Sequence, residues 1–168
     1  MRHTLIILLF SFVLQSVAAQ SGDQVFEFLT LPSSARANAL GGHTVSLVER
    51  DPSLIFHNPA LLGGEMDGMI NLDYMNYIAD VNVGSALFTK AFRERGAWGA
   101  GVHYFHNGKF KGMDEHNRPT GDFTANDIAL NGFFSYDLSE RWRGGVSMKF
   151  LYSNYDIYTS LGLCFDAG

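Results

Sequence analysis

Charged residues are scarce in this chain of 168 residues. They make up 17% of it, against roughly 25% in an average soluble domain. The formal net charge is −5, and no basic run interrupts the sequence. Nucleic-acid binding is therefore disfavoured, because it depends on clustered Lys and Arg. Cysteine is scarcer still: Cys164 is the only one, so no disulfide can form within the chain.

No constellation of catalytic or metal-ligating residues can be recognised. The sequence has no Gly-x-Ser-x-Gly elbow, and none of its six histidines stands in a motif with serine or aspartate. His103 and His106 are three residues apart on a predicted strand, which places them on opposite faces and suits no metal ion. We therefore expect no enzyme activity, no cofactor and no metal.

Long apolar runs are absent. The longest apolar run lies at the start of the chain and is too short to span a membrane, because a spanning helix needs about 20 residues. It extends from Leu5 to Val13, follows the basic Arg2, and precedes the small residues Ala18 and Ala19. This order is typical of a secretory signal peptide. Residues 1–19 are predicted to be that peptide, with Gln20 as the first residue of the exported chain.

Aromatic residues and glycine are abundant, at 14% and 18 residues respectively. They alternate with a period of two in residues 142–152, WRGGVSMKFLY, which predicts a β-strand. An uncharged face with aromatic ends, opposite a small and cationic face, is the pattern of a transmembrane barrel strand. The first face carries Trp142, Gly144, Val146, Met148, Phe150 and Tyr152; the second carries Arg143, Gly145, Ser147, Lys149 and Leu151.

The same alternation recurs along residues 67–168 and predicts about six antiparallel strands. It is clear in 98–104, 127–136 and 159–166 and weaker in 69–77 and 81–92, where the outward face of the second stays open. Connections near 93–96 and 138–141 are tight, whereas 106–122 is expected to be a long polar outer loop. The fold class is therefore all-β: an antiparallel transmembrane β-barrel of the outer membrane. The smallest such barrels have about eight strands, so we expect an incomplete barrel. Either the chain is a fragment of a longer protein, which we favour, or several chains close one barrel.

A soluble β-sandwich is the competing architecture. Rows of exposed aromatic side chains would make such a protein prone to aggregation, so the barrel is favoured.

Residues 20–66 do not alternate, and they predict a small hatch of helical turns. A serine at 33 or 34 can cap a first turn, and Gly41 can end it in the left-handed region. Asp51-Pro52 and Asn58-Pro59 are each a capping residue followed by proline at the first helical position. Gly63-Gly64 is expected to release the chain into the first strand. The segment is too small for a core of its own, so it should pack as a plug in the barrel lumen.

The run SARANALGG, followed by DPSLIFHNPALL, resembles the hatch of the FadL-type family of outer-membrane barrels. A closer resemblance, to the PorQ-like branch that serves type IX secretion, extends from VFEFLTLPSSARANALGG at 25–42 through GDFTA at 121–125 to YTSLGL at 158–163. The hatch positions that match are Ala35, Arg36, Ala37, Gly41, Gly42, Asn58, Pro59 and Ala60.

This resemblance implies a non-enzymatic component of type IX secretion in the bacterial outer membrane. Members of that branch are expected to anchor a surface partner, PorZ-like, beside a PorU–PorV-like pair of the cargo attachment complex. The resemblance to the wider family leaves a transporter of hydrophobic compounds as an alternative, which would need an apolar lumen. The candidate docking residues in the outer loop are Lys109, Lys111, Asp114, Glu115 and Arg118.

Overall fold

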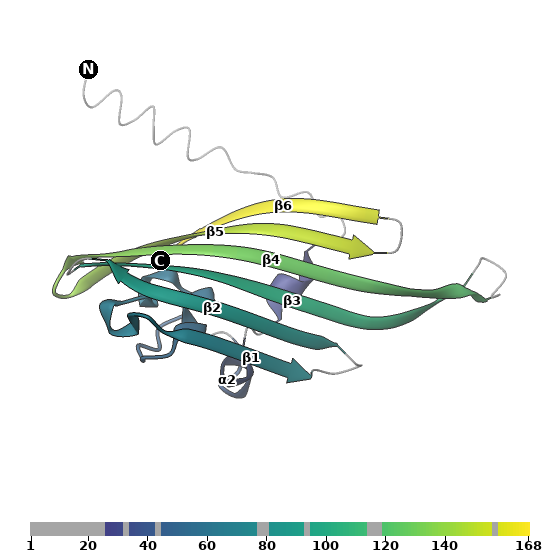
Figure 1. The fold of residues 1–168 in the computed structure, drawn as a ribbon, viewed down its shortest axis with the longest axis horizontal. Helices are drawn as coiled ribbons and strands as arrows, with labels where there is room; N and C mark the ends of the chain where they lie inside the picture. Colours follow the sequence, from purple (N-terminus) through teal and green to yellow (C-terminus); the bar gives the residue numbers. More distant parts are fainter. Residues whose placement is uncertain are drawn as a thin grey trace, which may run out of the picture.

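The computed structural model describes residues 26–31, 34–42, 45–76, 81–92, 95–113, 119–155 and 158–168. The predicted signal peptide lies outside them. The described residues form one six-stranded antiparallel sheet in which the strands follow one another in chain order (Figure 1), which confirms the all-β prediction. The strands are β1 (Ile70–Asn76), β2 (Asn82–Phe92), β3 (Gly96–Met113), β4 (Pro119–Ser139), β5 (Trp142–Tyr155) and β6 (Tyr158–Ala167).

Short helical turns precede the sheet, and three of them begin with the predicted caps. Ser34 Oγ accepts a hydrogen bond from the Ala37 amide at 3.1 Å, and Asp51 and Asn58 cap the two proline turns. The prediction that Gly63-Gly64 releases the chain directly into the first strand was wrong, because Gly64 begins one more helical turn before β1. The turns are η1 (Glu27–Thr30), α2 (Ala35–Ala39), η2 (Pro52–Phe56), η3 (Pro59–Leu61) and η4 (Gly64–Met66).

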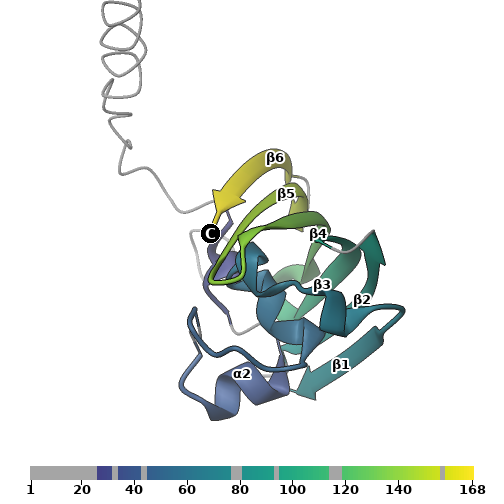
Figure 2. The ribbon, with the colours of Figure 1, turned by 90° about the vertical axis from the view of Figure 1, so that its left-hand side faces the viewer.

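The sheet is curved, and the turns of residues 45–66 lie on its concave side (Figure 2). Strand faces follow the predicted alternation: in β5, Val146 and Phe150 are exposed on the convex face, while Ser147 and Leu151 are buried on the concave face. In β2, where the sequence left the faces open, Leu87 is buried on the concave side. None of the helices among the described residues is long and apolar enough to cross a membrane.

The predicted outer loop at 106–122 is a hairpin instead, so that prediction was wrong. Strand β3 continues to Met113 and β4 begins at Pro119, and backbone pairing resumes at Lys109 after an irregularity that follows His106. Gly108 has a φ of 75°, which other residues adopt reluctantly. Polar composition misled the prediction, because backbone pairing can extend a two-stranded ribbon without the apolar alternation from which strands are predicted. Asp114, Glu115 and Arg118 lie outside the described residues.

Two apolar clusters join the turns to the concave face. The first lies towards the short connection between β4 and β5, which we call the short-turn end; the second lies towards the β3–β4 hairpin, the long-hairpin end. The first cluster contains Leu54, Ile55, Phe56, Leu61, Leu62, Met66, Leu87, Ala97 and Phe133; the second contains Phe28, Val83, Phe105, Ala129 and Leu151.

Candidate functional site

The site that the structure builds is the seat of the hatch on the concave face of the sheet; of the predicted hatch, 20–66, the structure describes 26–31, 34–42 and 45–66. Asn58 is the centre of its internal order. Its side-chain amide donates to the Val45 carbonyl at 2.7 Å, and its Oδ1 accepts from the Ala60 amide at 2.9 Å. Proline at 59 costs nothing here, because the first position of a helical turn needs no amide donor. The Asn-Pro-Ala motif thus ties the start of η3 to the segment between α2 and η2.

The Ala-Arg-Ala element is joined to the rest of the hatch by charge. Arg36 forms ion pairs with Glu49 and, at 3.4 Å, with Asp51. Ala37 is fully buried, and no larger side chain would fit there without displacing its neighbours. Gly41 and Gly42 have φ values of 98° and 95°, the left-handed region that ends the helix. The matched motif residues therefore stabilise the hatch itself.

The strands of the sheet, whose concave face we call the wall, contact the hatch at glycine positions, which have no side chain. A Cβ placed on Gly145 would lie 2.6 Å from the Pro59 carbonyl oxygen, and one on Gly101 would lie 3.2 Å from the Phe56 ring. Backbone therefore packs directly on backbone at Gly145. The sequence showed the small residues of this face, but it did not show that they meet the proline turn.

Hydroxyl groups of the wall bind carbonyl groups of the hatch. Ser135 Oγ donates to the Leu62 carbonyl and Thr89 Oγ1 donates to the Met66 carbonyl, both at 2.6 Å. Ser135 and Thr89 are almost completely buried. These bonds satisfy carbonyl oxygens that the short turns leave unpaired, which matters because a buried acceptor without a donor costs about 1–3 kcal/mol.

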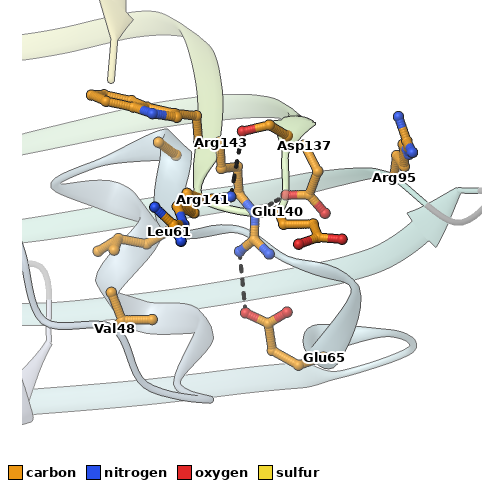
Figure 3. Close-up of a pocket in the computed structure, with 11 residues that line it drawn as sticks. Val48, Leu61, Glu65, Arg95, Asp137, Glu140, Arg141 and Arg143 are labelled. Carbon is orange, nitrogen blue, oxygen red and sulfur yellow. Dashed lines mark hydrogen bonds and ion pairs between the residues drawn. The ribbon is translucent and has the colours of Figure 1, made fainter.

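A charged cleft lies between the hatch and the wall at the short-turn end (Figure 3). Arg143 reaches from β5 to Glu65 of the hatch at 3.2 Å and also pairs with Asp137 of β4. The cleft has a volume of about 490 Å³, with Val48 and Leu61 on its apolar side and Arg141 and Glu140 at its rim. Ionic contacts therefore supplement the apolar seat at this end.

The remainder of the concave face is polar and internally bonded. Asp127 is fully buried and accepts hydrogen bonds from Ser153, from Asn107 at 2.7 Å and from Tyr155 at 3.1 Å. Lys149 pairs with Asp166 at 2.8 Å. Such bonding satisfies the polar groups on the part of the concave face beyond the seat of the hatch.

The histidines of β3 lie on opposite faces, as predicted. His103 is buried against Phe56, with ring centroids 3.9 Å apart, and His106 Nδ1 is 2.7 Å from Asn126 Oδ1. Among the described residues, no group of three or more His, Cys, Asp or Glu side chains is placed to hold a metal ion.

The convex face is apolar and has aromatic rows at both ends. Towards the long-hairpin end, strand register aligns Tyr74, Tyr104 and Tyr152 in one row across the sheet. Towards the short-turn end lie Trp98, Tyr136 and Trp142, and all six side chains are exposed. The exposed side chains between the two rows include Leu130, Phe134, Val146, Met148, Phe150, Leu161 and Leu163.

Of the candidate docking residues, the structure places the backbone of Lys109 opposite Thr124 and that of Lys111 opposite Asp122. Comparison with protein families, curated proteins and solved structures finds no match for this chain.

Proposed function

We propose that this chain forms part of the wall, together with the hatch, of an outer-membrane β-barrel that acts as a scaffold and not as an enzyme. One observation carries the proposal: a broad apolar face bounded by two aromatic rows lies opposite a polar face that carries the hatch. Barrels in lipid have this arrangement, with aromatic girdles at both membrane interfaces and a polar interior.

The spacing of the aromatic rows supports the same function. The rows are six residues apart in β3, from Trp98 to Tyr104, and ten residues apart in β5, from Trp142 to Tyr152, which is ~20–33 Å along the strands at ~3.3 Å per residue. At a strand tilt of ~40°, these lengths are ~15–25 Å along the membrane normal, and the longer one equals the height of the apolar band of such barrels. In water the same face would be a large exposed apolar patch and an aggregation hazard.

The place in type IX secretion rests on the resemblance of residues 25–42, 121–125 and 158–163 to the PorQ-like branch. In that role the barrel anchors a PorZ-like surface partner beside a PorU–PorV-like pair. The β3–β4 hairpin is the element suited to docking, because it extends past its neighbours. The pairing of β2 ends at His106 and that of β5 ends at Ala125, whereas β3 continues to Met113.

A transporter of hydrophobic compounds is the alternative function. It would need an apolar route between hatch and wall. The concave face instead presents Asp127, Asn131, Ser147 and Ser153, and residues 62–66 of the hatch are bonded to it through Ser135, Thr89 and Arg143. These features favour the scaffold over the channel.

The test uses the native protein in its own outer membrane. Lys109→Glu with Lys111→Glu reverses two charges of the hairpin. Arg95→Glu with Arg141→Glu, which reverses two exposed charges near the short-turn end, is the matched control. We expect the hairpin variant to reach the outer membrane in normal amount but to retain less surface partner after cross-linking and affinity capture. Unchanged capture of the surface partner would reject the hairpin as the docking element. Absence of the wild-type protein from the outer-membrane fraction would reject the barrel.

A further inference from the structure

Three oxygen atoms on the concave face of β1 and β2 are buried without a hydrogen-bond partner among the described residues. They are Asn71 Oδ1, Asp73 Oδ2 and Ser85 Oγ. The great majority of buried polar atoms in proteins have a hydrogen-bond partner, and an unpaired one can be explained by a bound water or ion. The three atoms belong to one patch. Asp73 is directly opposite Ser85 in the strand register, and Asn71 is two residues away on the same face.

A second carboxylate faces this patch from the hatch. Asp51 caps η2, which packs on β1, and it is close enough to Asp73 for the two charges to repel one another. Asp51 is already engaged, because its Oδ1 accepts from the Ser53 amide and hydroxyl and its Oδ2 is 3.4 Å from Arg36 Nε. Asp73 accepts a side-chain hydrogen bond from Asn71, but its Oδ2 has no partner among the described residues.

We propose that this seam between hatch and wall binds a hard divalent cation of the Ca²⁺ class. Carboxylate, amide and hydroxyl oxygens are the ligands that Ca²⁺ takes, in irregular geometry and with water in the remaining positions. A water molecule could donate to two of the three oxygens and a proton could neutralise Asp73, but only a cation would engage all three oxygens and balance the charge as well. Mg²⁺ fits less well, since it demands octahedral geometry and retains most of its water.

The buried, unpaired hydroxyl of Ser85 distinguishes this patch from a simple pair of carboxylates. The Ser85 side chain is 7% exposed, and its Oγ is among the unpartnered atoms. The ligands come from strands β1 and β2, while Asp51 contributes its charge from the hatch. A bound cation would therefore link the hatch to the wall on the side opposite Arg143 of β5.

Direct binding is measured on the complete native protein, purified in detergent and treated with a chelator. Tb³⁺ is the luminescent probe for the site and Ca²⁺ is its competitor. We expect Tb³⁺ emission that Ca²⁺ reverses, and an upward shift of Tm by a few degrees on adding excess Ca²⁺, because a ligand that binds the folded state stabilises it. Mg²⁺ at the same concentration should give a smaller shift. Absence of both the emission and the Tm shift in the wild-type protein would overturn the proposal and leave a buried water in the patch.

The variant Asp73→Asn assigns the site. It should lose the Ca²⁺-dependent part of Tm, while its Tm in chelator should equal or exceed that of the wild type, because the repulsion with Asp51 is gone. Asp166→Asn, which breaks the pair with Lys149 on the same concave face, is the control and should keep the full Ca²⁺ response. An undiminished Ca²⁺ response in Asp73→Asn would overturn the assignment.

Discussion

Alanine at position 145 should loosen the seat of the hatch. The added Cβ would lie 2.4 Å from the Pro59 carbonyl carbon, whereas contacts between carbon atoms are optimal near 3.5–4.0 Å. The hatch would have to move away by ~1 Å, and nearby lies the bond from Ser135 to the Leu62 carbonyl. Overpacking of a tight contact costs about 1–3 kcal/mol. We expect Gly145→Ala to lower the free energy of unfolding by that amount.

The neighbouring glycine provides the control. A Cβ on Gly144 would meet Leu138 Cδ1 at 3.6 Å, an ordinary contact on the convex face. Replacing a strand glycine with alanine normally stabilises by roughly 0.5–1 kcal/mol, so Gly144→Ala should be neutral or stabilising. The assay is denaturant unfolding of the protein in micelles, followed by limited proteolysis of residues 45–66. Equal unfolding free energies and equal cleavage rates in the two variants would refute the direct packing of the hatch on β5.

Three further substitutions test other contacts. Ser135→Ala leaves the buried Leu62 carbonyl without its donor and should cost about 1–3 kcal/mol in denaturant unfolding; an unchanged midpoint would contradict the bond. Asn58→Ala removes the bonds to the Val45 carbonyl and the Ala60 amide, so ion conductance in a planar bilayer should rise; conductance as low as in the wild type would mean that the hatch does not block a pore. Phe134→Lys, between the two aromatic rows, should lower the free energy of unfolding in lipid by about 2–4 kcal/mol, against ~0–1 kcal/mol for Tyr104→Lys at the boundary. Equal losses in the two variants would contradict the proposal that the convex face lies in the bilayer.

The strand faces and the caps were predictable because both signals are local. A period of two assigns each side chain to a face, as in β5, once the residues are known to form a strand. A capping side chain followed by proline, as at Asp51 and Asn58, specifies the start of a turn within three residues. The sequence did not decide which face of β2 points outward, because Ala86 and Ala91 are small enough to lie on either face.

The seat of the hatch was not predictable, since its contacts join distant parts of the chain. Ser135 and Leu62 are 73 residues apart, and Arg143 and Glu65 are 78 residues apart. A serine in a strand has the same pattern whether it faces water, a lumen or a carbonyl group. The continuation of β3 beyond His106 was missed for a related reason: backbone pairing builds that ribbon, and side-chain periodicity does not report it.

The small residues of the concave face have a physical role that composition alone does not show. A short helical turn leaves carbonyl groups unpaired, and bulky side chains on the wall would keep donors away from them. Gly145 lets the proline turn approach the backbone of β5, and at that distance Ser135 can reach the Leu62 carbonyl. Close approach and hydrogen bonding are therefore one requirement. A larger residue at 145 should weaken the Ser135 bond as well, so the effects of Gly145→Ala and Ser135→Ala should sum to more than that of the double variant.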